Sequence, residues 1–540
     1  MRERDGLWLV MSSAYIGAEL AAEFGNLPPA FLPVGSARLY EYQLARISAG
    51  RTVYLTIPEG FEPNPEDLRR LQDFKVSLIP IPDGMRLGEA VVYAVNSIGE
   101  PDQALRILHG DTLIDDLSTG EADIVAVANL GDGYSWAQVD VIDGRILKLE
   151  TIAAGSEYVA NRPVATGFFV FSSSTAFVRA VTRARGDFID GINRYARDVA
   201  LRPLRVESWY DFGHAQTYFR SRRAVTTARA FNALRLDGRT ARKSSQDGHK
   251  MRAEADWLRQ VPPQVQLYCV RVLDAGTEGG QEFYETEYQY IPTLSELFVF
   301  GALGRPAWSR IADACAEFLD ICAANPPSDI AAAVGNTYLH KLAIGKTMAR
   351  LDDYARATGF DIDHDLIVSG RPVPSLSRMA QEFAQIVGRA PERPAVIMHG
   401  DFCFSNILFD SRTNRIKVID PRGYIDVGAP SVFGDTRYDL AKLARSVIGR
   451  YDQIIAGRYS LTVNDRYSFS LSFERSTQLA WLHDMFADIT VAGTRLGSSE
   501  VSAIMAGLFL SMLPLHADRP DRQQAYIANA ARLYRSFDES

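Results

Sequence analysis

The segment 399–406 (HGDFCFSN) places an aspartate and an asparagine at the spacing D-x-x-x-x-N, and Asp420 follows at the end of a β-prone run. Phosphoryl transfer uses these residue types in this order. An aspartate accepts the proton of the attacking hydroxyl, while an asparagine and a second aspartate hold Mg²⁺ against the phosphates of ATP. We therefore expect Asp401 to be the catalytic residue and Asn406 and Asp420 to be metal ligands, with ATP and Mg²⁺ as cofactors. The alternative for each aspartate taken alone is a turn or capping role.

The phosphates of ATP also need an anchored cation, which kinases supply as a strand lysine paired with a glutamate on a helix. The run TARKSS offers Lys243 at a predicted strand end, and HKMRAEADWLRQ offers Glu254 on the next helix. Lys250 is a second candidate lysine, but it lies at the helix start, where a solvated charge is common. We favour Lys243 as the nucleotide-binding lysine. The alternative is that Lys243 and Glu254 form only an exposed ion pair, which contributes little.

The surrounding pattern indicates which elements must position these residues. A predicted hairpin, ILFD-SRTN-RIKVID, returns Asp420 to the loop that carries Asp401. Residues 226–295 read as a small β-rich lobe, and residues 296–540 as a mainly helical lobe. The C-terminal half is therefore expected to be an α+β domain with two lobes, in the order found in protein kinases.

These motifs resemble those of the aminoglycoside phosphotransferase and choline kinase family. HGDFCFSNILF is similar to the family's H-G-D-x-x-x-x-N loop, VIDPRG to its metal-binding strand end, and GDTRYDLAKL from Gly434 to the helix that follows. The resemblance implies ATP- and Mg²⁺-dependent phosphorylation of a small-molecule hydroxyl, with adenine bound by the segment around Glu287. The run LRLDGRT is poor in glycine at the place where the family covers the phosphates.

Four neighbouring residues are expected to support the catalytic loop rather than to react. His399 should hold the loop by hydrogen bonds, and Asp435 and Asp439 should brace it from the following segment. Cys403 is expected to be a small core residue rather than a nucleophile.

The first 225 residues alternate β-rich runs such as LWLVM and TVYLTI with amphipathic segments such as ARLYEYQLARI. This alternation predicts an α/β domain on a largely parallel sheet. The DG turn in QVDVIDGRILKLETI predicts an antiparallel hairpin at its edge. We place the boundary to the second domain within the segment 222–232, so that the first domain spans residues 1–225.

The first domain resembles the sugar nucleotidyltransferase family, which has a Rossmann-like mixed sheet. The similarity lies in GNLPPAFLPVG, LHGDTLIDD, ATGFFVF and WYDFGHAQTYFRSRR, and it implies that Asp111 and Asp211 hold Mg²⁺ for nucleotidyl transfer. The family's G-x-G-x-R phosphate loop is replaced by MSSAYIGAELAAEFG, and Pro29 stands where its lysine would be. Nucleotidyl transfer therefore stays open, the alternatives being that Asp111 and Asp211 bind another ligand or are relics of the fold.

Composition excludes several classes of protein. A formal net charge of −8 gives no positive field for a nucleic-acid backbone, and four cysteines without a CxxC pair give neither a zinc motif nor a disulfide framework. The N-terminal apolar run is too short for a signal peptide, and the apolar stretch 502–515 is too short to span a bilayer. We expect a cytoplasmic protein without membrane insertion, in which residues 502–515 form a buried helix.

The patterns together favour an enzyme that phosphorylates a hydroxyl of a sugar, polyol or amino alcohol. The first domain would then activate the product as a nucleotide derivative, or bind a second nucleotide or a sugar phosphate. Such a fusion would suit the synthesis of precursors for capsule or other surface polysaccharides. The alternative is a non-catalytic sensor or scaffold that binds nucleotides or sugars.

Overall fold

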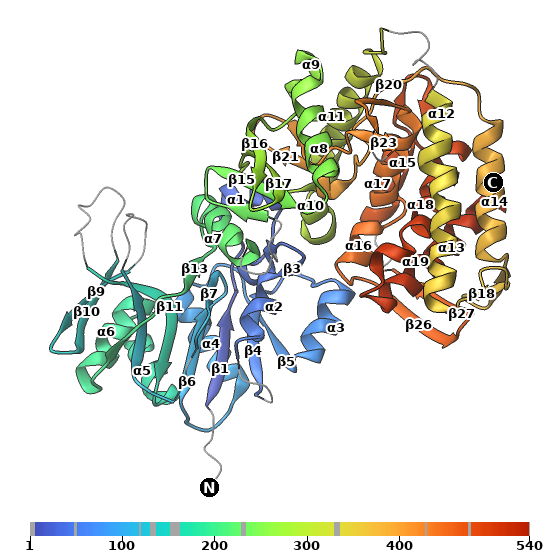
Figure 1. The fold of residues 1–540 in the computed structure, drawn as a ribbon. Coiled ribbons are helices and arrows are strands. Elements are labelled where there is room, and N and C mark those ends of the chain that lie inside the picture. The colour runs from blue at the N-terminus through green and yellow to red at the C-terminus, as the bar shows by residue number, and fades with distance from the viewer. Residues whose placement is uncertain are drawn as a thin grey trace. The chain divides into compact units, whose positions relative to one another are not determined.

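The computed structural model describes residues 6–47, 51–117, 120–129, 137–151, 162–227, 234–328, 335–426, 429–473 and 477–538. They form two compact units (Figure 1), one made of Met1–Val225 with Phe300–Ala302 and the other of Thr226–Val299 with Leu303–Ser540. The predicted boundary segment 222–232 lies partly outside the described residues. Among the described helices, none has the length and hydrophobicity to cross a lipid bilayer.

A large mixed sheet forms the centre of the first unit. Its strands are β1 (Leu7–Met11), β4 (Val53–Pro58), β5 (Val76–Ile81), β6 (Leu105–His109), β8 (Ile124–Ala128), β9 (Ala137–Ile142), β10 (Arg145–Thr151), β11 (Val164–Phe171) and β12 (Arg202–Arg205). The strand order is β10-β9-β11-β6-β1-β4-β5, with β8 pairing with β11 and β12. β1 runs parallel to both of its neighbours, whereas β11 is antiparallel to β6. Every residue of β1 is buried, as expected of a central strand covered on both faces.

Helices and short strands complete this unit. The helices are α1 (Ala18–Phe24), α2 (Leu39–Leu44), α3 (Pro65–Asp73), α4 (Leu87–Ile98), α5 (Ser174–Arg183), α6 (Phe188–Asp198) and α7 (Ala215–Thr227), and the short strands are β2 (Pro33–Val34), β3 (Ala37–Arg38), β7 (Thr112–Ile114) and β13 (Trp209–Asp211). The predicted DG hairpin joins β9 to β10, and Asp143 and Gly144 both adopt positive φ, as a tight hairpin turn requires. The buried apolar residues of the sheet, α4, α5 and α6 form one core.

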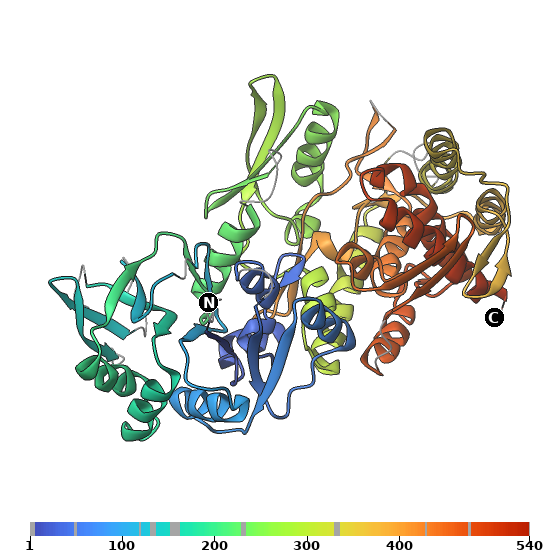
Figure 2. The same ribbon diagram turned by 90° about the horizontal axis from the view of Figure 1, so that it is seen from below.

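The second unit begins with a small antiparallel sheet and one long helix, seen from two directions in Figures 1 and 2. The sheet has the order β14-β15-β17-β16. Its elements are β14 (Leu234–Leu236), β15 (Thr240–Ser245), α8 (Gly248–Gln260), α9 (Pro263–Gln266), β16 (Val272–Glu278) and β17 (Gln281–Glu287). Lys243 lies within β15 rather than at its end, where we had expected it. Its backbone is therefore held by pairing on both sides of the strand.

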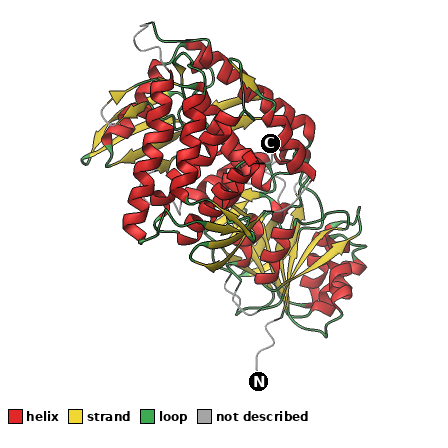
Figure 3. Ribbon diagram, turned by 90° about the vertical axis from the view of Figure 1, so that its right-hand side faces the viewer, coloured by secondary structure: helices red, strands yellow, loops and turns green. Residues whose placement is uncertain are grey.

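The rest of the second unit is mainly helical (Figure 3). Its helices are α10 (Leu294–Phe300), α11 (Arg305–Ala323), α12 (Gly335–Leu339), α13 (Lys346–Thr358), α14 (Leu376–Arg389), α15 (Thr436–Val447), α16 (Tyr451–Ile455), α17 (Thr477–Ala487), α18 (Ser499–Ser511) and α19 (Pro520–Asp538). α18 is buried along most of its length, in agreement with the prediction for residues 502–515. A π-helical stretch, His340–Gly345, leads directly into α13.

Short strands connect these helices and carry the catalytic loop. They are β18 (Leu366–Val368), β19 (Arg371–Val373), β20 (Val396–Ile397), β21 (Ile407–Asp410), β22 (Arg415–Val418), β23 (Tyr424–Asp426), β24 (Ala429–Pro430), β25 (Phe433–Gly434), β26 (Ser460–Asp465), β27 (Ser468–Ser472), β28 (Thr490–Val491) and β29 (Thr494–Arg495). β21 and β22 form the predicted hairpin. The fold class is confirmed: an α/β unit with a mixed sheet, followed by an α+β unit with a small sheet and a large helical part.

Candidate active site

The catalytic loop follows β20 and is held from α15. The backbone N–H groups of His399 and Gly400 both donate to the Asp439 carboxylate at 2.7 Å. Gly400 has φ +77°, and a Cβ there would lie 2.6 Å from the Cβ of Arg422, so glycine is required. Burial raises the pKa of Asp439 to about 7, although both hydrogen bonds act to lower it. The prediction that Asp439 braces the loop is confirmed.

Asp435 and Cys403 also have structural roles. Asp435 caps α15 and forms a buried ion pair with Arg437, so it supports the helix start rather than the loop itself. Cys403 is buried, and burial raises the pKa of its thiol to about 11. A thiol with so high a pKa is a poor nucleophile, as expected of a core residue.

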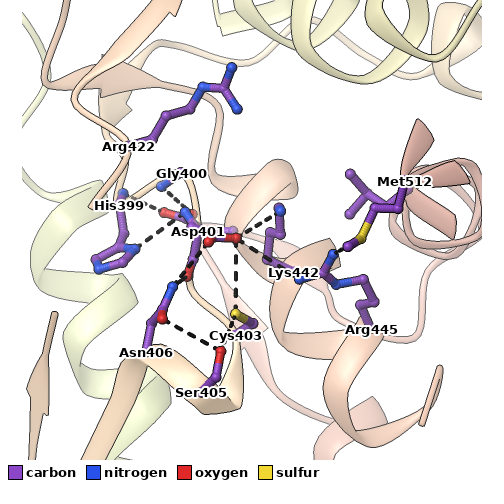
Figure 4. Close-up of polar contacts among 12 residues, drawn as sticks. His399, Gly400, Asp401, Cys403, Ser405, Asn406, Arg422, Lys442, Arg445 and Met512 are labelled. Atoms are coloured by element: carbon purple, nitrogen blue, oxygen red, sulfur yellow. Dashed lines mark hydrogen bonds and ion pairs between the residues drawn. The ribbon is translucent and has the colours of Figure 1, made fainter. Parts of the chain in front are cut away.

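Asp401 stands at the centre of the polar contacts in Figure 4. Its Oδ1 lies 2.7 Å from Lys442 Nζ and 3.9 Å from the Arg445 guanidinium, and its Oδ2 accepts a 3.0 Å hydrogen bond from Asn406 Nδ2. Burial disfavours the charged carboxylate. The positive charges of Lys442 and Arg445 overcome that effect and hold the pKa of Asp401 well below its usual range. An ionised carboxylate can accept a hydrogen bond from an acceptor hydroxyl.

Sequence reasoning missed Lys442 and Arg445. Asp439, Lys442 and Ser446 lie on one face of α15, and each serves the catalytic loop: Ser446 Oγ accepts from the N–H of Phe404 at 3.0 Å. The available signal was the spacing of three and four between polar residues in an otherwise buried helix, which places them on one face.

Asn406 and Asp420 are brought together by the β21–β22 hairpin. The register pairs Ile407 with Val418, and the Ile419 N–H donates to the Asn406 carbonyl at 3.0 Å. The Asn406 amide nitrogen donates to Asp401. Its Oδ1, which accepts from Ser405 Oγ at 3.5 Å, is the candidate metal ligand. Together with the Asp420 carboxylate, this provides the oxygen donors that Mg²⁺ prefers. These residues therefore fit a magnesium site.

Lys243 and Glu254 join Asp420 in one polar cluster. Lys243 Nζ lies 2.8 Å from Glu254 Oε2 and 3.1 Å from Asp420 Oδ2. Tyr284, opposite Lys243 on β17, contacts both carboxylates through its hydroxyl, at 2.8 Å and 3.1 Å. Lys250, the second candidate lysine, lies 3.8 Å from Glu254 and is about half exposed. The geometry thus places Lys243, rather than Lys250, next to Asp420.

One cavity of about 280 Å³ unites these groups. Asp401, Asp420, Lys243 and Glu254 all line it. Glu287 does not: it ends β17, where its carboxylate accepts from the Arg271 N–H at 3.2 Å. Its role in adenine binding stays a prediction.

Asp111 and Asp211 come together in the first unit, beside a cavity of about 440 Å³. β13 pairs with β7, and a Cβ at Gly213 would lie 2.7 Å from Asp111 Oδ2 and 3.3 Å from Asp211 Oδ1. Burial, and then the charge of Asp111, raises the pKa of Asp211 to about 6. Adjacent carboxylates of this kind need a cation or a shared proton. The segment 12–17, which follows β1, does not line this cavity.

Comparison with known proteins agrees with the C-terminal site. The model of the phosphotransferase enzyme family matches residues 215–468. This match confirms the resemblance predicted for the C-terminal region. No curated protein matches the sequence at a significant level.

Several solved structures are similar to parts of the chain. A UTP-bound UGPase from Acinetobacter baumannii is 16% identical, with 42% of this chain and 95% of that chain covered and a TM-score of 0.33. A thermostable mutant of the aminoglycoside phosphotransferase APH(4)-Ia, without ligand, is 16% identical over 57% of this chain and 90% of that chain, with a TM-score of 0.38. A ternary complex of the same enzyme with ADP and hygromycin B is also 16% identical, over 56% and 88%, with a TM-score of 0.34. Both kinds of protein named in the sequence resemblances thus occur among the similar structures.

Proposed function

We propose that the C-terminal unit transfers the γ-phosphoryl group of ATP to a hydroxyl of a sugar, polyol or amino alcohol. The observation that carries this proposal is the arrangement of Asp401, Asp420 and Lys243 around one cavity, with Asn406 bonded to Asp401. Phosphoryl transfer depends mainly on positioning and on neutralising charge, and these groups supply both.

Each residue has a distinct task in this reaction. Asp401, kept ionised by Lys442, accepts the hydrogen bond of the acceptor hydroxyl and receives its proton as the new phosphate ester forms. Lys243, anchored by Glu254, binds the α- and β-phosphates of ATP. Asn406 and Asp420 would hold Mg²⁺, which when bound neutralises charge on the phosphates.

The direct test is incubation of the purified protein with ATP, Mg²⁺ and a panel of sugars, polyols and amino alcohols, followed by mass spectrometry of the products. We expect a phosphorylated product that disappears in Asp401→Ala, while ATP binding stays within about twofold, because the base contacts the acceptor rather than the nucleotide. Asp410→Asn, at the last residue of β21, where the carboxylate accepts hydrogen bonds from Arg412 and Thr413 of the hairpin turn, is the matched control and should keep full activity. Full turnover by Asp401→Ala would remove Asp401 from the mechanism.

We propose for the first unit a role in binding a nucleotide or a sugar phosphate, in the synthesis of precursors for surface polysaccharides. The support is the cavity that holds Asp111 and Asp211. A second candidate function for the whole chain is a non-catalytic sensor or scaffold. It is favoured by the segment 12–17, which stands in place of a phosphate loop and yet lies outside that cavity. Phosphoryl transfer that depends on Asp401 would decide against it.

A further inference from the structure

The cavity of the C-terminal unit carries more positive than negative charge. Its acidic lining residues are Glu254, Asp401 and Asp420, and its basic ones are Lys243, Lys250, Lys346, Arg350, Arg422, Lys442 and Arg445. All three carboxylates already contact a cation: Glu254 and Asp420 share Lys243, and Asp401 contacts Lys442. The remaining positive charge is therefore not balanced by acidic residues of the cavity.

Lys346, Arg350 and Arg422 form no ion pair with a carboxylate of the described residues. Arg350 donates to the carbonyl of Ser511 at 2.9 Å, and Arg422 donates to the carbonyl of Tyr424 at 2.9 Å. Lys346 Nζ has neither a hydrogen bond nor an ion pair within the same described part of the chain. These three residues are called the cationic cluster below.

Lys346 and Arg350 are one turn apart on α13, so both lie on the same face of that helix. Like charges at this spacing destabilise a helix, and burial adds to that cost. Burial lowers the pKa of Lys346 to about 6, and the positive charges of Arg422, Arg350 and Lys442 act in the same direction, opposed only by Asp401. α13 also begins directly after the π-helical stretch His340–Gly345, and such stretches occur frequently at functional sites.

Two members of the cationic cluster, Lys346 and Arg350, line the cavity from α13. Lys346 and Arg350 come from the helical part of the unit, and the cavity they line also contains Asp401, which must meet the acceptor hydroxyl. The nucleotide groups Lys243 and Glu254 come from β15 and α8. A charged ligand group next to the acceptor hydroxyl would therefore be negative.

We infer that the acceptor carries an anionic group, a phosphate or a carboxylate, besides the hydroxyl that is phosphorylated, and that the cationic cluster binds this group. The inference rests on the proposed function, and it narrows the acceptor to phosphorylated or acidic sugars and polyols. Cationic amino alcohols are disfavoured, because their ammonium group would meet Lys346 and Arg350.

Matched acceptors test this inference directly. Glycerol, glycerol 3-phosphate and glycerate form one set, glucose, glucose 6-phosphate and gluconate a second, and choline represents the cationic class. We expect kcat/KM for at least one anionic member to exceed that for its neutral counterpart at least about tenfold, since hydrogen bonds to charged groups are the stronger class. The phosphate and carboxylate members of each set distinguish the two sources of charge. A neutral or cationic acceptor that is preferred over its anionic counterparts would overturn the inference and leave the proposed function standing.

Substitutions of the charged residues on α13 test whether the cationic cluster binds the anionic group of the acceptor. In Lys346→Met and Arg350→Met, assayed below about pH 6, where the Lys346 amine is charged, KM for the anionic acceptor should rise at least about tenfold, while KM for ATP stays within about twofold. Arg356→Met is the control, because Arg356 lies exposed on the same helix and pairs with Asp353. An increase in the KM for ATP without a change for the acceptor would assign the cationic cluster to the nucleotide and overturn the inference.

A binding measurement keeps the inference testable even if no acceptor in the panel is phosphorylated. Inorganic phosphate is titrated by calorimetry into the full chain saturated with Mg²⁺ and a non-hydrolysable ATP analogue. We expect binding that weakens at least about tenfold in Lys346→Met and not in Arg356→Met. Absent binding, or equal binding by both variants, would overturn the inference. If phosphate binding depends on the cationic cluster but no phosphoryl transfer occurs, the result counts against the proposed function and not against the anion-binding role of the cluster.

Discussion

Lys442 Nζ lies 2.7 Å from Asp401 Oδ1, and this ion pair joins α15 to the catalytic loop. Arg445, one turn further along α15, adds a second positive charge at 3.9 Å. Because α15 also holds the loop through Asp439, one helix sets both the position and the charge of the carboxylate that we propose to be catalytic. Asp401 is therefore weakly basic but firmly oriented. That combination suits a loose transition state, in which the acceptor hydroxyl loses its proton late.

Lys442→Met should lower kcat about tenfold to 100-fold and leave the Kd for ATP within about twofold. Loss of the cation raises the pKa of Asp401, so the acid limb of the pH–rate profile should move to higher pH. Steady-state kinetics measure both effects, with the acid limb followed down to the lowest pH at which the protein stays folded. Arg378→Met, which breaks an exposed ion pair with Glu382, is the control. An unchanged acid limb would show that Lys442 does not act through Asp401.

Asp420→Asn should abolish the Mg²⁺-dependent part of ATP affinity, because a neutral amide is a weak ligand for a hard cation and cannot balance the phosphates. We expect the Kd for ATP to become nearly independent of the Mg²⁺ concentration. Asp410→Asn, at the end of β21 in the same hairpin, should behave like the unaltered protein. A normal Mg²⁺ dependence in Asp420→Asn would require another residue to hold the metal.

Affinity for an anionic acceptor should fall as pH rises. The pKa of Lys346 is lowered to about 6, so in the free protein its amine is charged below that pH and neutral above it. With gluconate or glycerate, whose carboxylates stay ionised, KM should rise about tenfold between pH 6 and 8. Lys346→Met should show a high KM with little pH dependence. A KM that falls over this range would contradict the assignment of Lys346.

The candidate catalytic residues can be proposed from the sequence because they are close along the chain. Asp401 and Asn406 share one loop, and Asp420 follows through a hairpin with a clear turn signal. Lys243 and Glu254 could be proposed for the same reason, since one turn separates β15 from α8. Residues that are close along the chain remain close in the folded protein, so a local sequence pattern is enough to propose them.

The helical residues around the cavity could not be predicted in the same way. Lys346 and Arg350 lie far before the catalytic loop in the chain, and Lys442 and Arg445 follow it on a separate helix. A lysine or arginine on an amphipathic helix usually faces solvent. Only tertiary packing brings these helices to one cavity, so their charges have no local signature. The position of Lys243 within β15 rather than at its end was likewise settled by strand pairing.

The first unit, expressed alone as residues 1–225, should fold but release little or no pyrophosphate from any nucleoside triphosphate and sugar phosphate. Folding is expected because its core is formed by the sheet with α4, α5 and α6, all within this range. A cooperative thermal transition and a native-like circular dichroism spectrum would verify it.

The expected inactivity follows from what occupies the place of a phosphate loop. The Ser12 N–H donates to Thr56 Oγ1 at 2.8 Å, and Ser12 Oγ accepts from the Ala30 N–H at 3.0 Å, so these groups serve the fold rather than a triphosphate. Pro29, where a lysine would bind phosphate, begins a short 3₁₀ turn. Asp111 and Asp211 can place a metal ion but cannot replace the missing amide and cationic donors. The same assay on the full chain carrying Asp401→Ala controls for any contribution of Phe300–Ala302, which groups with this unit. Brisk pyrophosphate release that disappears in Asp111→Ala would show that the segment after β1 still binds phosphates and that the protein catalyses both reactions.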